Sequence, residues 1–129
     1  MDSGALIAYL QGEPGGNEVA LLLADTQNAL SVHAVNLTEV YYHFLRAFDE
    51  PTADNAINDL ISDGMIVRED LDMSFWKSVG KLKARGRLSL ADCFCIALAQ
   101  RLSCEVVTTD HHEFDPLVSL NLCTFRFIR

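Results

Sequence analysis

Two kinds of apolar pattern alternate along the chain, and they divide it into predicted helices and predicted strands. Segments with apolar positions three or four residues apart predict amphipathic helices. These segments span residues 3–11, 17–26, 37–48, 51–62, 74–84 and 90–102. Short runs rich in β-branched residues predict strands. These runs span residues 29–35, 65–68, 104–109 and 123–128.

Local signals at the segment ends support this division. The GEPGG sequence at 12–16 predicts a turn after the first helix, and Gly64 predicts the end of the fourth. Asn36 is predicted to be the N-cap of helix 37–48, and Ser89 is predicted to open the last helix.

The alternation of helices and strands predicts an α/β fold. Strands separated by helices indicate a mainly parallel central sheet with helices on both faces, which is a three-layer α/β/α architecture. The 129 residues contain no repeat, linker or low-complexity segment, so we expect a single domain over residues 1–129. In such sheets ligands bind beyond the carboxyl ends of the strands.

Four acidic residues occupy positions that a parallel sheet would bring to one edge. Asp2 precedes the first helix, and Asp110 directly follows strand 104–109. Glu39 and Asp92 each lie in the first turn of a helix. Clustered carboxylates repel one another and favour hard divalent cations such as Mg²⁺ or Mn²⁺. Two such ions would suit the hydrolysis of a phosphodiester.

These acids also have structural interpretations. Asn36-x-x-Glu39 matches a capping box, in which the acid accepts a backbone N–H group. Ser89-x-x-Asp92 matches the same motif, and Asp110 fits an ordinary turn residue. The shared edge favours a common metal-binding role over separate structural ones.

Charge and composition narrow the range of functions. The formal net charge of −8 argues against broad, sequence-independent binding to nucleic acid. Half of the residues are hydrophobic, which argues against disorder, and no apolar run is long enough to cross a bilayer. No export signal is visible, so we expect a cytoplasmic protein.

The basic residues are unevenly distributed, because half of them fall within one segment. This segment contains Lys77, Lys81, Lys83, Arg85 and Arg87. Arg85 and Arg87 lie in the loop before helix 90–102, where guanidinium groups suit a localised phosphate contact. A solvated helix face explains the same segment equally well.

Four sequence blocks, in this order, resemble those of PIN-domain nucleases. They are DSGALIAYL (2–10), NLTEVYY (36–42), LSLADCFCIALAQ (88–100) and VVTTDHHEF (106–114). The resemblance implies an endonuclease of single-stranded RNA that uses Mg²⁺ or Mn²⁺ and leaves a 5′-phosphate and a 3′-hydroxyl. It also implies a VapC-type toxin that forms a homodimer and is held inactive by a small antitoxin protein.

The resemblance assigns roles to individual residues. It places the catalytic, metal-binding acids of the family at Asp2, Glu39, Asp92 and Asp110. It adds Asp115 as a supplementary metal ligand and Thr109 as a hydroxyl residue that positions Asp110 or a water. Arg85 and Arg87 then become candidates to hold an RNA phosphate beside the metal ions.

Two features depart from the family pattern. Members usually have Ser or Thr two residues after the first acid, where this chain has Gly4. They also have a full apolar strand before that acid, in the middle of the sheet, whereas only Met1 precedes Asp2. We therefore expect either a truncated first strand or a sheet that is completed differently. These departures also suggest an alternative function, in which the chain is a catalytically inactive PIN-like module that only binds a protein or RNA partner.

Overall fold

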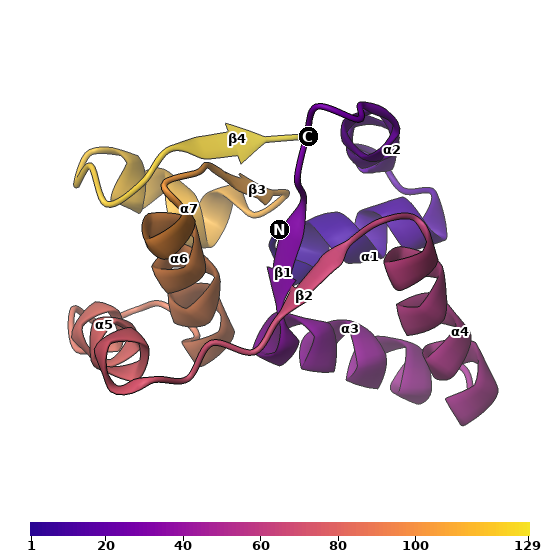
Figure 1. Ribbon diagram of the computed structural model, residues 1–129, viewed down its shortest axis with the longest axis horizontal. Coiled ribbons are helices and arrows are strands. Elements are labelled where there is room, and N and C mark those ends of the chain that lie inside the picture. The colour runs from indigo at the N-terminus through magenta and orange to yellow at the C-terminus, as the bar shows by residue number, and fades with distance from the viewer.

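Six of the seven helices and all four strands follow one another in the predicted order (Figure 1). The computed structural model describes all residues from 1 to 129. The helices are α1 (Ser3–Gln11), α2 (Gly16–Ala24), α3 (Ala34–Ala47), α4 (Glu50–Ser62), α5 (Met73–Lys83), α6 (Leu90–Leu102) and α7 (His111–Val118). The strands are β1 (Ser31–His33), β2 (Ile66–Arg68), β3 (Val106–Thr108) and β4 (Phe125–Phe127).

The strands form two parallel pairs, β1 with β2 and β3 with β4. The first two residues of the chain lie between these pairs. The Met1 amino group donates to the Ser31 carbonyl oxygen of β1 at 2.7 Å, and the Asp2 N–H donates to the Val107 carbonyl oxygen of β3 at 3.0 Å. The spatial order is therefore β2-β1-(Met1–Asp2)-β3-β4. All strand pairing is parallel, which confirms the predicted mainly parallel α/β fold.

Helices cover both faces of the strands (Figure 1), and each face has its own hydrophobic core. Val107 of β3 packs with residues of α1 to α4, whereas the adjacent Val106 packs with residues of α5, α6 and α7. Successive strand residues point to opposite faces of a sheet, so the helices form two outer layers as predicted. None of these helices is long and apolar enough to span a membrane.

The start of α3 differs from the prediction. His33, not Asn36, is the N-cap, because its Nδ1 accepts a backbone N–H of the first turn at 3.1 Å and the helix begins at Ala34. Asn36 is fully buried inside the helix, and its side-chain amide donates to the Ala91 carbonyl oxygen at 3.1 Å. This contact ties α3 to α6.

The strands are shorter than their β-branched runs predicted, with three residues in each. At the carboxyl end of the first run, Ala34 and Val35 belong to α3, which begins directly after β1. In the run 104–109, only Val106, Val107 and Thr108 pair with β4.

Candidate active site

One cleft, with a volume of about 410 Å³, is lined by all four predicted acids. Its acidic residues come from the chain start, α3, α6 and the N-cap of α7, and they are Asp2, Glu39, Asp92 and Asp110. The structure thus brings together four carboxylates that are far apart in the sequence. The cleft lies where the strands end and the following helices begin, which is the usual ligand position in a parallel sheet.

Hydroxyl groups hold two of these acids. Thr108 Oγ1, at the end of β3, donates to Asp2 Oδ2 at 2.8 Å. Ser3 Oγ donates to Glu39 Oε2 at 2.5 Å. Ser3 Oγ also lies 3.4 Å from Asp2 Oδ1, a distance at which a hydrogen bond is weak. Glu39 therefore keeps one oxygen free, whereas both oxygens of Asp2 have a hydroxyl neighbour.

Backbone N–H groups at helix N-termini hold the other two acids. Asp92 Oδ2 accepts the Ser89 N–H at 3.0 Å, and Ser89 Oγ accepts the Asp92 N–H at 3.1 Å. Asp110 Oδ1 accepts the Glu113 N–H at 3.0 Å. The capping box at Ser89 is confirmed, whereas the one suggested for Glu39 is absent because α3 begins earlier. Each cap uses a single carboxylate oxygen, so the acid can serve both roles.

Burial and mutual repulsion make two of the acids hard to ionise. Burial raises the pKa of Asp92 to about 6, the Ser89 hydrogen bonds oppose the rise, and the charges of Asp2 and Glu39 add to it. Burial also raises the pKa of Asp2, against the lowering effect of the Thr108 hydroxyl. None of the four acids forms a salt bridge. The cleft therefore concentrates negative charge that no salt bridge neutralises.

This donor set fits a hard divalent cation. In this structure no group of three or more acidic, histidine or cysteine side chains is arranged so that it could hold a metal ion. Glu39, Asp92 and Asp110 nevertheless each have one oxygen held by a hydrogen bond and one oxygen without such a bond, and the Asp2 carboxylate is held by Thr108. Hydrogen bonds of this kind orient carboxylate ligands for a metal, and Mg²⁺ and Mn²⁺ prefer oxygen donors.

The hydroxyl that positions the acids belongs to Thr108, although the prediction gave this role to Thr109. Thr108 Oγ1 donates to Asp2 and also accepts the Asp110 N–H at 3.0 Å, so one group connects the first and last acids. Thr109 lines the cleft, and its hydroxyl lies beside Gly4. No hydrogen bond joins it to Asp110.

Three other predicted residues lie outside the cleft. Asp115 contacts His111 Nδ1 at 3.0 Å on the exposed side of α7. Arg85 and Arg87 line a separate pocket of about 420 Å³. The two cavities are neighbours, because His111 lines the acidic cleft and the next residue, His112, lines the arginine pocket.

Several polar cleft residues were missed by the sequence reasoning. They are Ser3, Tyr42, His43, His111 and Arg129. Tyr42 and His43 follow Glu39 by three and four residues, so the helical spacing placed them on the same face and could have identified them. Ser3 was overlooked because its partner lies 36 residues away along the chain.

His111 reaches the cleft through tertiary contacts that leave no sequence signal. Its ring stacks on Phe127 with 4.2 Å between the ring centroids. Nδ1 contacts Asp115, and Nε2 contacts the Arg129 carbonyl oxygen at 2.8 Å. The Asp115 carboxylate and this carbonyl raise the pKa of His111. An imidazolium with both N–H groups engaged is therefore favoured at the cleft.

Close packing beside the acids requires glycine at position 4. A Cβ on Gly4 would lie 2.7 Å from Thr109 Oγ1 and 3.3 Å from Asp2 Oδ2, which leaves no room for the family's Ser or Thr. We predict that Gly4→Ala lowers the free energy of unfolding by about 1–3 kcal/mol, because overpacking forces neighbours to move. Urea denaturation measures this change.

Gly80→Ala in α5 is the matched control for this substitution. Nothing lies within 4 Å of a Cβ on Gly80, so alanine should stabilise the helix by about 0.5–1 kcal/mol. Adding Thr109→Ala to Gly4→Ala should recover part of the loss. The packing explanation is wrong if the two alanine variants change stability equally.

Comparison with known proteins places this architecture in a family. The sequence profile of the PIN domain matches residues 1–116. The fold is similar to the crystal structure of VapC20 from Mycobacterium tuberculosis, a sarcin-ricin loop cleaving toxin, with a TM-score of 0.70. The two sequences are 14% identical, and the match covers 89% of this chain and 92% of that one. No curated protein matches the sequence significantly. The chain therefore belongs to the PIN-domain family.

Proposed function

We propose that this protein is an endoribonuclease that hydrolyses phosphodiester bonds of single-stranded RNA with Mg²⁺ or Mn²⁺ as its cofactor. One observation carries the proposal. Four carboxylates line one cleft, each is held by a hydrogen bond, and none of them forms a salt bridge. Membership of the PIN-domain family and the likeness to an RNA-cleaving toxin support this chemistry.

The protein's own part in the reaction is to hold the acids in place. The hydroxyl groups of Ser3 and Thr108 and two helix N-termini each hold one oxygen of an acid, and all four acids line the same cleft. A bound divalent cation supplies the charge that activates water and stabilises the leaving oxygen. Without it Asp92 retains a proton near pH 6, so cation binding is coupled to proton release.

Positively charged side chains at the cleft favour the approach of RNA phosphates. His111 and Arg129 line the cleft beside the acids, and the raised pKa of His111 favours its charged form. Bases of single-stranded RNA are accessible, whereas those of an A-form duplex lie in a deep, narrow groove. We therefore assign single-stranded segments or loops as the substrate class.

We further assign the role of the toxin in a toxin–antitoxin pair, acting in the cytoplasm. An exposed apolar row on α3 and its C-cap supports a protein partner, either a second copy or a small antitoxin. Tyr42, Leu45 and Phe48 follow one another at three-residue intervals and are 46%, 42% and 60% exposed. Exposed apolar sets of this kind mark protein contacts. Because Tyr42 also lines the acidic cleft, an antitoxin on this row would obstruct RNA.

Cleavage of an end-labelled single-stranded RNA by the purified protein tests the proposed activity. We expect cleavage with Mg²⁺ or Mn²⁺, none in EDTA, and a 5′-phosphate on the downstream fragment. The same RNA annealed to its complement is the control and should be cut more slowly. Cleavage that persists in EDTA would overturn the metal dependence. Inactivity with both metals would favour the alternative of a module that only binds a partner.

The arginine pocket next to the cleft offers a second contact for the RNA backbone. We predict that Arg85→Ala combined with Arg87→Ala raises KM for RNA about 10-fold with little change in kcat, because charged hydrogen bonds to phosphate act in binding alone. The dependence of log KM on log salt concentration should become shallower by about 1.4, because each charge contributes about 0.7 on a single strand. Lys77→Ala combined with Lys81→Ala on α5 removes the same charge outside both cavities and is the control. A fall in kcat with unchanged KM would contradict this assignment.

A further inference from the structure

The arginine pocket beside the acidic cleft contains more kinds of side chain than a phosphate contact uses. Its volume of about 420 Å³ lies within the range of about 300–1,000 Å³ that is usual for small-molecule sites. Besides the two arginines, its lining contains His112 and a single acid, Glu113. The rest is mainly apolar, from Leu82, Leu88, Pro116, Leu117, Leu120 and Leu122. A phosphate would contact the arginines, which leaves the acid and the apolar wall for another part of a ligand.

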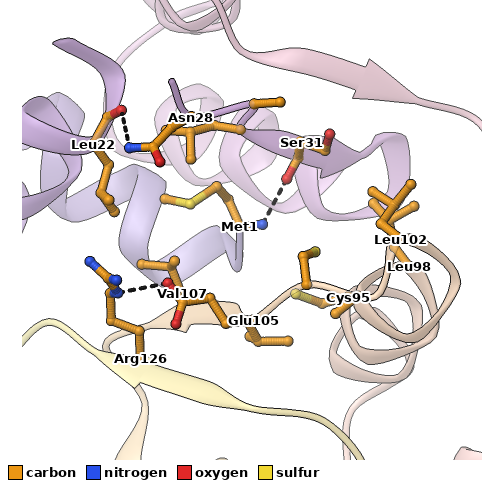
Figure 2. A pocket seen from close by; sticks show the side chains of 15 residues that line it. Met1, Leu22, Asn28, Ser31, Cys95, Leu98, Leu102, Glu105, Val107 and Arg126 are labelled. Atoms are coloured by element: carbon orange, nitrogen blue, oxygen red, sulfur yellow. Dashed lines mark hydrogen bonds and ion pairs between the residues drawn. The ribbon is translucent and has the colours of Figure 1, made fainter. Parts of the chain in front are cut away.

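The charged groups of this pocket are not paired with one another. None of Arg85, Arg87 and Glu113 takes part in a salt bridge. In the mainly apolar pocket of Figure 2, by contrast, Glu105 and Arg126 neutralise each other at 2.7 Å. Unpaired charges of both signs favour a ligand that offers an anion and hydrogen-bond donors at separate points.

Local structure fixes both sides of the arginine pocket. Lys83 Nζ donates to the Leu88 carbonyl oxygen at 2.5 Å, which bridges the loop that carries the arginines. Gly86 has a φ of 128°, so this loop turns at a residue that needs no Cβ. On the other side, Glu113 lies in the first turn of α7, and its N–H donates to Asp110 Oδ1 at 3.0 Å. An RNA strand with a phosphate at the acids can therefore place a neighbouring base in this pocket.

The single acid of the pocket distinguishes between the four RNA bases. An ionised carboxylate accepts hydrogen bonds at two oxygens and donates none. Guanine has two adjacent donors on its Watson–Crick edge, the N1–H group and the N2 amine. Adenine, cytosine and uracil each have an acceptor beside their one donor group. Single-stranded RNA exposes this edge to proteins, and extruded bases stack on apolar side chains. Guanine therefore matches Glu113, and its flat ring suits the leucine wall.

We propose that the arginine pocket binds a guanine base of the RNA substrate, with the Glu113 carboxylate accepting hydrogen bonds from the N1–H group and the N2 amine. The inference rests on the proposed function, because it concerns the RNA that the acidic cleft cuts. Arg85 and Arg87 hold the adjacent phosphate, and the base lies against the leucines. Guanine is thereby selected at a fixed distance from the cleavage site. Glu113 determines specificity and is not one of the catalytic acids.

Nuclear magnetic resonance titration of the full chain with short RNA in EDTA tests the proposal. The probe is the RNA pentamer UUGUU, and UUAUU is the comparison. We expect saturable shifts of the Glu113 amide with a Kd below about 1 mM, and at least about tenfold weaker binding of UUAUU. Inosine in place of guanine removes the N2 amine, and N1-methylguanine removes the N1–H group. Each change should weaken binding about tenfold, as expected for losing a charged hydrogen bond. A 7-deazaguanine, altered only on the opposite edge, should bind like guanine.

Glu113→Gln tests the carboxylate directly. Glutamine keeps the size of the side chain, but it replaces one acceptor oxygen by an NH₂ group that would face a donor of guanine. Binding of UUGUU should weaken about tenfold, and its advantage over UUAUU should largely disappear. Glu18→Gln makes the same change in the first turn of α2, outside both cavities, and is the matched control. It should keep the guanine preference.

The outcomes separate this inference from the proposed function. EDTA prevents metal-dependent cleavage, so a guanine preference in binding is measured whether or not the protein is a nuclease. Absent or equal binding of the two RNAs, or an unchanged preference in Glu113→Gln, would overturn the inference and leave metal-dependent cleavage unaffected. Free guanosine 5′-monophosphate that binds as tightly as UUGUU would also overturn it, because the pocket would then be a site for a free nucleotide.

Discussion

Asp92→Asn is expected to lower metal-dependent RNA cleavage by at least about 100-fold, since residues that only support a metal ligand already change activity about 10- to 100-fold. Asp92 fixes Oδ2 on the Ser89 N–H and leaves Oδ1 to the cleft. Asparagine can keep the first contact through its oxygen, but it then presents an NH₂ group, which cannot bind a cation. The capping box and the fold are retained while the metal ligand is lost. Initial rates at saturating Mn²⁺ measure the effect.

Asp59→Asn is the matched control, because it makes the same chemical change on the exposed side of α4, outside the cleft. Its cleavage rate should equal that of the unmodified protein. Circular dichroism of both variants checks that the helices are intact. An Asp92→Asn protein that retains more than about a tenth of the activity would remove this acid from the site. It would also remove the main support for the four-carboxylate proposal.

The fold class and the convergence of the acids could be predicted because both follow from local signals and one topological rule. The helix that Ser89 opens and the β-branched run before Asp110 are strong patterns, and the structure has both elements close to the predicted positions. A parallel sheet then brings strand ends and helix starts to one edge. This rule placed Asp2 and Glu39 in the same cleft although no local pattern links them.

The hydroxyl contacts that hold Asp2 and Glu39 could not be predicted, because each depends on a partner distant in sequence. Thr108 holds Asp2 across 106 residues of chain. Asn36 has a strong N-cap preference, but its buried bond to the Ala91 carbonyl oxygen keeps it inside α3, and His33 caps the helix instead. Local propensity was outweighed there by a tertiary contact.

Tertiary packing also determines the positions of the residues that were predicted in addition to the four acids. Asp115 lies four residues after His111 in α7, and this helical spacing pairs the two on the exposed side of the helix. Its carboxylate is therefore turned from the cleft. The two arginines precede α6, but the first turn of α7 separates their pocket from the acids. Neither outcome follows from a strand or helix pattern alone, because each depends on how α7 packs.

The metal-free protein is expected to be more stable at pH 5.5 than at pH 7.5, because of the acids in the cleft. The pKa of Asp92 is about 6 in the folded protein against 3.8 when unperturbed. A raised carboxyl pKa means that the folded state binds the proton more tightly, so the stabilisation is present at low pH and lost as the pH rises through about 6. Asp2 acts in the same direction. The acids that ion pairs stabilise, Asp70 and Asp72, have lowered pKa values and stay ionised across this range.

Asp92→Asn isolates this contribution, so the substitution that abolishes cleavage should also stabilise the metal-free protein at pH 7.5. The full pKa difference corresponds to about 3 kcal/mol, and water in the cleft reduces the expected gain to about 1–2 kcal/mol. In a chain of this size the melting temperature should rise by about 3–8 °C, with a weaker dependence on pH. Mg²⁺ should stabilise the unmodified protein by mass action and the variant far less. Thermal denaturation at both pH values, with and without Mg²⁺, measures all of these effects.

If Asp92→Asn has the same melting temperature and Mg²⁺ response as the unmodified protein, the acids do not repel one another enough to require a cation. Excess negative charge would then be no reason for this cleft to bind a metal.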